Sequence, residues 1–133
     1  MDAVGKAAQG MSDVIGGVDD VLAELLRHEE ILGALAVSVE GLIIGCAGIE
    51  GSDAEVAGAL GAALVGATER TMRRLGAGAA STVSIATSDG MIHLRNGGDF
   101  ALIVFSEPTD GTAIGQVCQG VLARIGQLLQ PVA

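Results

Sequence analysis

One segment of the chain, Asp53 to Leu75, has the periodicity of a helix but an unfavourable composition for one. Between Ala54 and Ala67, nine of the fourteen residues are Ala or Gly, and no charged residue occurs from Val56 to Thr68. The three glycines lower helix stability by ~2–3 kcal/mol relative to alanine. Close packing on the small residues has to offset this loss, so we expect the helix to be buried on two sides.

A helical wheel of 3.6 residues per turn divides this segment into two faces. One face is bulky and apolar, and we expect its Val56, Leu60 and Leu64 to contact the protein's own sheet. The other face permits close approach of a second backbone because its residues are small and uncharged: Gly58, Gly61, Ala62, Val65 and Gly66. We favour a subunit contact over burial in one larger core, because 133 residues provide limited material to surround a helix.

The segments before this helix predict a helix and a hairpin. Residues 1–17 are expected to form an N-terminal extension that is partly flexible or helical. A Gly16–Gly17 break then precedes a helix over Val18 to Arg27. The segments GALAVSV and LIIGCA flank a Glu40–Gly41 turn and predict two paired strands. Ser52 and Glu55 predict a capping box that opens the Gly/Ala helix.

The segments after this helix predict a meander and a last helix. STVSIAT, MIHLRN and DFALIVFS are separated by glycine-containing turns and predict three antiparallel strands. Gly111 to Gln130 has apolar residues at helical spacing and ends before Pro131. The sequence therefore predicts an α+β domain over 18–133, with the order α-β-β-α-β-β-β-α and one five-stranded, mostly antiparallel sheet covered by helices.

Composition excludes several classes of partner. The net charge is −9, with one lysine, and the only aromatic residues are Phe100 and Phe105. A nucleic-acid binder would lack its main electrostatic contribution and a stacking surface, so we expect no nucleic-acid partner. No apolar run approaches the ~20 residues that span a bilayer, and the N-terminus has no signal-peptide pattern. We expect a cytoplasmic protein without direct membrane insertion.

The chain offers few candidates for chemistry. His28 and His93 have no neighbours at ligand spacing, and His93 is expected to face solvent or a partner. Cys46 and Cys118 are expected to be reduced and buried, with a disulfide as the less favoured alternative. A Cys46–His93 nucleophile pair is conceivable, but no third orienting group is indicated. We predict no catalytic residue, no cofactor and no metal site, and hence no enzyme.

Three arginines lie at the end of the long helix. Arg70, Arg73 and Arg74 complement the negative end of the helix dipole, and Glu69 can pair with Arg73 at i+4. This structural role explains most of the cluster. A partner-contact patch is the functional alternative, and an arginine finger for a bound GTPase is a less favoured one.

The sequence resembles the roadblock/dynein light chain family in four features. These are the order of elements, the GALAVSVEGLII hairpin with Gly41 at its turn, the Ala/Gly-rich second helix and the Gly98–Asp99 entry to the last strand. The resemblance extends over about Val18 to Gln130. It implies a roadblock or profilin-like sandwich. It also implies a homodimer in which the second helices, here Ser52 to Leu75, pack side by side, and the third strands, here Ser81 to Thr87, pair into one sheet.

Bacterial and archaeal members of this family resemble regulators or scaffolds of small Ras-like GTPases, and some stimulate GTP hydrolysis without inserting an arginine. Eukaryotic relatives serve dynein and lysosomal scaffolds. The resemblance therefore implies a non-catalytic homodimer that binds a Ras-like GTPase. The predicted dimer or partner interface combines the small face with residues near it and on the third strand: Gly58, Gly61, Ala62, Val65, Gly66, Glu69, Arg73, Thr82 and Ser84. The alternative is a small-ligand sensor of profilin-like or PAS-like architecture, which an apolar cavity between sheet and helices would favour.

Overall fold

The computed structural model describes residues 2–109 and 112–130 of the chain. Within this part, the elements follow the predicted order α-β-β-α-β-β-β-α. Their bounds are α1 Asp2–Leu25, β1 Ile31–Ser38, β2 Ile43–Ala47, α2 Gly51–Arg74, β3 Thr82–Ala86, β4 Met91–Asn96, β5 Phe100–Ser106 and α3 Thr112–Leu129.

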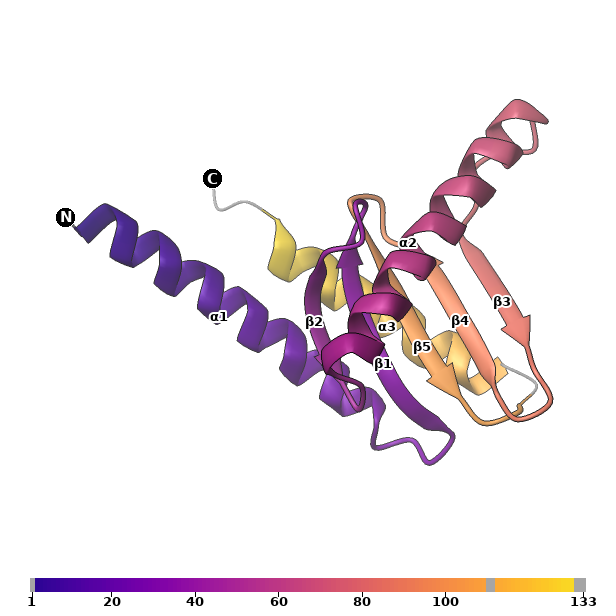
Figure 1. Ribbon diagram of the computed structural model, residues 1–133, viewed down its shortest axis with the longest axis horizontal. Helices are drawn as coiled ribbons and strands as arrows, with labels where there is room; N and C mark the ends of the chain where they lie inside the picture. Colours follow the sequence, from indigo (N-terminus) through magenta and orange to yellow (C-terminus); the bar gives the residue numbers. More distant parts are fainter. Residues whose placement is uncertain (1, 110–111, 131–133) are drawn as a thin grey trace.

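The five strands form one sheet in the spatial order β2-β1-β5-β4-β3. Every neighbouring pair is antiparallel, which confirms the predicted sheet. The β1–β2 hairpin joins the β3-β4-β5 meander through β1 and β5, whose register aligns Leu35 with Ile103. The two edges of the sheet are therefore β2 and β3 (Figure 1).

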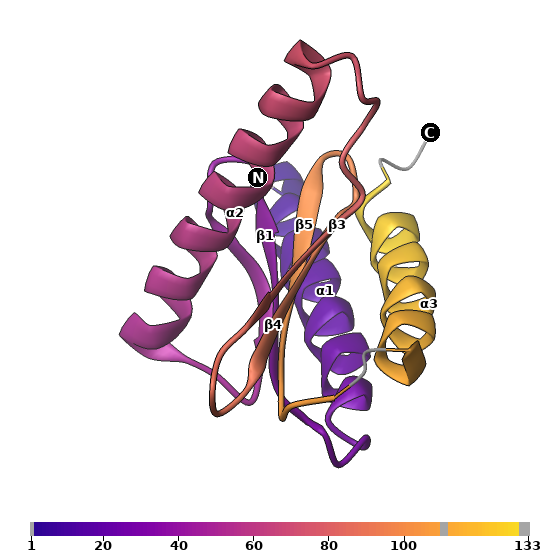
Figure 2. The ribbon, with the colours of Figure 1, turned by 90° about the vertical axis from the view of Figure 1, so that its right-hand side faces the viewer.

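Helices cover both faces of the sheet, with α1 and α3 on one face and α2 on the other (Figure 2). Alternate residues of β5 point to the two faces. Leu102 and Val104 pack in a core with α1 and α3. Ala101 and Ile103 pack in a second core beneath α2. Because both faces are covered, β5 is almost entirely apolar and buried.

The β1–β2 hairpin turns at Glu40–Gly41, as predicted. Gly41 has a φ of 90°, which glycine adopts without steric cost. Its N–H donates a hydrogen bond to the carbonyl oxygen of Ser38 at 2.9 Å. A Cβ at Gly41 would lie 3.2 Å from Ala59 Cα, so the turn packs closely against the middle of α2.

The predicted break at Gly16–Gly17 is wrong, because α1 runs without interruption from Asp2 to Leu25. Gly17 faces the Leu128 side chain of α3, with 3.5 Å between that side chain and a Cβ built at the glycine. Packing of Val18 and its apolar neighbours in the α1/α3 core offsets the low helix propensity of two glycines. The N-terminal part of α1 extends past the sheet (Figure 1). The division into 1–17 and 18–133 stays a prediction.

The predicted capping box at the start of α2 is also wrong. The helix begins at Gly51, and its N-cap is Glu50, which has extended backbone angles and makes no side-chain capping bond. Ser52 therefore already lies inside the first turn, where its hydroxyl is not placed to cap. The first-turn acid Asp53 still complements the positive end of the helix dipole.

Candidate interaction surface on α2 and β3

The glycines of α2 contact the sheet of their own chain. Gly58 and Gly61 are buried, as is Ala54. A Cβ at Gly61 would lie 2.2 Å from Ile103 Cδ1 and 2.9 Å from Ile103 Cγ1. A Cβ at Gly58 would lie 3.0 Å from Val37 Cγ1. The close backbone approach that the small residues permit is thus between α2 and its own sheet.

The predicted orientation of α2 is therefore wrong. Val56 and Leu60, which were expected to face the sheet, are each 60% exposed, and Leu64 is 39% exposed. Gly58 and Gly61 were expected to face a partner, but the sheet occupies that side of them. The physical reason is that both faces are uncharged, so helical periodicity separates them without indicating which one is inside.

The other predicted residues of α2 are more accessible. Ala62 and Val65 are half-buried and pack against the α2-side core. Gly66 is half-buried, and a Cβ there would meet only Arg70 Nη1, at 3.2 Å. These three residues remain candidates for an interface with another chain, because contacts within this chain leave each of them half-buried.

A contiguous apolar surface on α2 is left uncovered. We call it the α2 stripe; it consists of the exposed residues Val56, Leu60, Ala63, Leu64 and Ala67. Beside it lies a hollow of about 370 Å³ between α2 and the strands, where Ile92 and Phe105 complete the wall. Exposed apolar patches of this kind mark interaction surfaces in soluble proteins.

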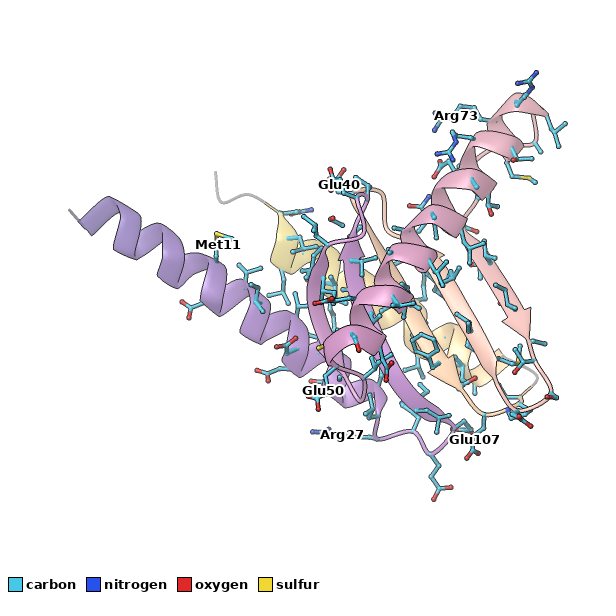
Figure 3. The ribbon with its side chains drawn as sticks, in the orientation of Figure 1. Met11, Arg27, Glu40, Glu50, Arg73 and Glu107 are labelled. Carbon is cyan, nitrogen blue, oxygen red and sulfur yellow. The ribbon has the colours of Figure 1, made fainter. Side chains whose placement is uncertain are left out.

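The arginine cluster continues the same side of the helix. Arg70, Arg73 and Arg74 line a second hollow of about 650 Å³ together with Thr71 and Ala67, the last residue of the α2 stripe. Figure 3 shows Arg73 at the end of α2 that extends past the sheet, opposite Glu50. The three cations therefore lie on a projecting helix end that is open to a partner.

Glu69 links this helix end to the sheet. Its carboxylate pairs with the Arg73 guanidinium at 3.4 Å, which confirms the predicted i,i+4 pair. It also accepts a hydrogen bond from the Asn96 side-chain amide of β4. An exposed ion pair of this type contributes less than about 1 kcal/mol, so the contact with Asn96 is what positions Glu69.

The edge strand β3 carries the last two predicted residues, Thr82 and Ser84, and both are exposed. The Ser81 carbonyl accepts a hydrogen bond from Asn96 N–H at 3.0 Å, and Thr87 N–H donates to the Gly90 carbonyl at 2.8 Å. The odd-numbered residues of β3 thus bond to β4. Because successive residues of a strand direct their backbone groups to opposite sides, those of Thr82 and Ser84 point to the open edge.

His93 does not face solvent, which corrects the sequence prediction. It is 5% exposed, because its side of β4 is the one that α3 covers. Its Nε2 lies 2.9 Å from Ser106 Oγ, and the Ser106 hydroxyl donates to the Glu107 carbonyl at 2.9 Å. Since that hydroxyl proton is already used, His93 Nε2 must carry the proton and donate. Burial lowers the pKa of His93, and the Arg95 charge lowers it further.

We expect this histidine to make folding stability depend on pH. His93 has a lower pKa folded than unfolded, so the unfolded chain binds a proton first as the pH falls. Its contribution is complete above the unfolded pKa of about 6.5 and is lost below it, with a slope limited to ~1.4 kcal/mol per pH unit for one proton. Urea unfolding between pH 7.5 and 5 measures this slope. A His93→Gln variant with the same slope would contradict the assignment.

The two cysteines lie in different layers. Cys46 packs against the α2-side core and Cys118 lies in the α1/α3 core, so the sheet separates them, and both thiols are free. Burial raises the pKa of each thiol, which disfavours a thiolate nucleophile at neutral pH. Cys46 is on β2 and His93 is on β4, with β1 and β5 between them. The structure therefore does not bring the conceivable nucleophile pair together.

Among the described residues, no group of three or more His, Cys, Asp or Glu side chains is placed to hold a metal ion. None of the helices in that part of the chain is both long and apolar enough to cross a membrane. The α2 stripe, its arginine end and the β3 edge are features that the geometry offers for recognition.

Comparison with known proteins agrees with this geometry. The uncharacterized protein MJ0310 of Methanocaldococcus jannaschii is 35% identical over 91 residues, which are 68% of this chain and 79% of that protein. A Roadblock/LC7 domain from Streptomyces avermitilis superposes with a TM-score of 0.79 at 18% identity, covering 84% of this chain and 96% of that one.

Myxococcus xanthus MglB superposes with a TM-score of 0.77 at 14% identity, covering 90% of this chain and 95% of that one. These structural likenesses establish the fold. The model of the Roadblock/LC7 domain matches residues 17–107, which include α2 and the whole sheet. The chain is therefore a member of the Roadblock/LC7 domain family.

Proposed function

We propose that this protein is a non-catalytic homodimer that regulates or scaffolds a small Ras-like GTPase in the cytoplasm. Membership of the Roadblock/LC7 family supports the proposal. The observation that carries it is the combination of an uncovered apolar stripe on α2 with an open edge at β3. Covering both with a second copy removes exposed apolar surface and satisfies the free backbone groups of the edge.

In the proposed dimer, the α2 helices lie side by side and the β3 strands pair across the two-fold axis. The half-buried Val83 and Ile85 of β3 lie on the α2 side of the sheet, since Val83 is aligned with Leu94. A second copy would therefore cover them together with Leu60 and Leu64. In this arrangement, one continuous surface on α2, β3 and β4 forms the dimer interface.

The GTPase would bind the outer side of the paired α2 helices. Gly58 and Gly61 are unavailable for this contact because they pack on the sheet. The accessible part of the predicted interface, Ala62, Gly66, Glu69 and Arg73, remains the proposed partner surface. Arg73 has a 77% exposed side chain and is its most accessible charge.

Pulldown of the host's Ras-like GTPases with the purified protein, in both nucleotide states, tests this function. Single-turnover GTP hydrolysis with and without the protein then separates an activator from a passive scaffold. We expect Arg73→Glu to weaken binding about tenfold, whereas Arg27→Glu, an equal charge change at an exposed position near the other end of the molecule (Figure 3), leaves binding unchanged. Failure of every GTPase to bind would rule the function out.

A small-ligand sensor is the second candidate, because the hollow of about 370 Å³ beside α2 has apolar walls such as Leu64, Ile92 and Phe105. A ligand in this hollow would occupy the surface that the proposed dimer covers. The two functions therefore predict opposite results. Apolar fluorescent probes that bind and dissociate the dimer would favour a sensor, whereas a dimer that excludes the probe favours the scaffold.

A further inference from the structure

The two edges of the sheet differ in what lies beside them. At one edge, β3 pairs with β4 in an unbroken register over its five residues. The backbone groups of Thr82 and Ser84 point away from β4, to the open side. At the other edge, β2 also has five residues. Three features of the chain interfere with the addition of a further strand to β2.

The first feature is a bulge in β2. Ala36 of β1 is aligned with Gly45. Val37, the next residue of β1, is aligned with Ile43. Ile44 is therefore an extra residue on β2. An extra residue interrupts the regular row of backbone groups along a strand and increases its local twist, so a strand from another molecule meets an irregular ladder here.

The second feature is a hydrogen bond between β2 and helix α1. The backbone N–H of Cys46 donates to Asp19 Oδ1 at 2.9 Å. Since this N–H bonds to α1 rather than to β1, it is a donor that a further strand would need. The Asp19 carboxylate thus occupies the position that a backbone carbonyl of an added strand would take.

The third feature is the close fit of α1 on β2, which holds Asp19 in place. A Cβ at Gly45 would lie 2.6 Å from Val18 Cγ1 and 2.9 Å from Asp19 Oδ1. Val18 is fully buried in the α1/α3 core, so a larger residue at position 45 would push α1 away from β2. Asp19 follows Val18 and is half-buried at the edge. Packing of the helix therefore positions the carboxylate.

We propose that Asp19 closes the β2 edge against strands of other molecules, so that the sheet is extended only at β3. The inference rests on the proposed homodimer for one point, which is that pairing at β3 leaves each dimer with two β2 edges. If these edges were open, β2 strands would link dimers into a chain without end. Asp19 thus decides between a finite dimer and an open filament.

The charge of Asp19 acts in the same direction as its hydrogen bond. An added strand would strip water from the carboxylate, and the loss of hydration of a charged group is unfavourable. A strand that displaced Asp19 from Cys46 would gain one backbone hydrogen bond but break one that already exists. Neither change favours pairing, so the β2 edge stays closed although its strand is as long as β3.

Removal of the carboxylate tests the proposal. Asp19→Ala leaves the Cys46 N–H without its acceptor and takes the charge from the edge. We expect the weight-average mass to rise with concentration, to at least about twice the wild-type mass at ~200 µM, as measured by analytical ultracentrifugation. In dilute solution, hydrogen exchange of the Cys46 amide should accelerate at least about tenfold. Circular dichroism checks that the variant folds.

Two further variants make the result specific. Asp20→Ala is the matched control, because Asp20 is the next residue of α1 and is exposed. The same change of charge there should alter neither the mass nor the exchange of Cys46. Asp19→Asn removes the charge but keeps an oxygen that accepts from Cys46, so its mass should match that of the wild type. An Asp20→Ala chain that assembles as Asp19→Ala does would refute the proposal, because loss of charge alone would explain the association.

The outcomes separate this inference from the proposed homodimer. A folded Asp19→Ala chain with the wild-type mass at ~200 µM would refute the closure and leave the homodimer intact. A monomeric wild type would refute the homodimer. The closure would then be supported by an Asp19→Ala chain that dimerises and refuted by one that stays monomeric. The wild type alone also tests the closure, because a Cys46 amide that exchanges as fast as an exposed one would refute it even if Asp19→Ala failed to fold.

Discussion

Replacing Gly61 with leucine should lower the free energy of unfolding by about 3 kcal/mol, because the new side chain enters a space that is already full. Its Cβ alone would lie 2.2 Å from Ile103 Cδ1, and Ile103 is 1% exposed at the centre of the α2-side core. Either α2 lifts from the sheet or the core repacks. Urea denaturation at fixed protein concentration measures the loss, since dimerisation would make stability concentration-dependent.

Gly66 is the matched control on the same helix. A Cβ there meets only the flexible Arg70 side chain at 3.2 Å, so Gly66→Ala should raise the free energy of unfolding by roughly 0.5–1 kcal/mol through helix propensity. Equal effects at the two glycines would contradict the orientation of α2. A stable, fully folded Gly61→Leu variant would do so as well.

Replacing Leu60 with arginine should abolish self-association while leaving the monomer folded. The side chain is 60% exposed, so the change removes little of the chain's own packing. In the proposed dimer, it would bury a charge in the centre of an apolar contact and raise the dissociation constant at least 100-fold. Light scattering coupled to gel filtration measures the mass, and circular dichroism checks the fold.

Leu42→Arg is the control for this change, because Leu42 is 70% exposed near the β1–β2 turn and away from the stripe. The mass of the Leu42→Arg assembly, measured by light scattering, should match that of the wild type.

The β3 edge offers an independent variant. Ser84→Pro removes an N–H that points to the open edge rather than to β4, so it should also weaken the dimer, whereas Ser84→Ala should not. A Leu60→Arg chain that remains dimeric would refute the α2 contact.

Much of the fold follows from local patterns. The hairpin turn at Gly41 and the meander were predictable because glycine-containing turns separate short strands of alternating or apolar residues. The last helix was predictable because its apolar residues recur at helical spacing over five turns. These signals are contained within each segment and need no knowledge of what lies beside it.

The errors occurred where a neighbouring element decided the outcome. Gly16 and Gly17 stay helical because α1 packs on α3, including Leu128. His93 is buried because α3 covers that side of β4 and because its Nε2 donates a hydrogen bond to Ser106 Oγ. In each case an element distant in the sequence supplied the stabilising contact, and the local pattern contained no trace of it.

Helix α2 shows most clearly the difference between what local sequence patterns predict and what contacts with distant elements decide. Composition and helical periodicity establish that α2 has two uncharged faces, one small and one bulky, and that close packing must offset its glycines. Which of the two faces lies inside depends on the packing of α2 against the rest of the fold. The glycine face lies on the sheet because Ile103 and Val37 fill the space that side chains would take. That choice leaves Val56, Leu60 and Leu64 uncovered, since a single helix cannot bury both faces against one sheet.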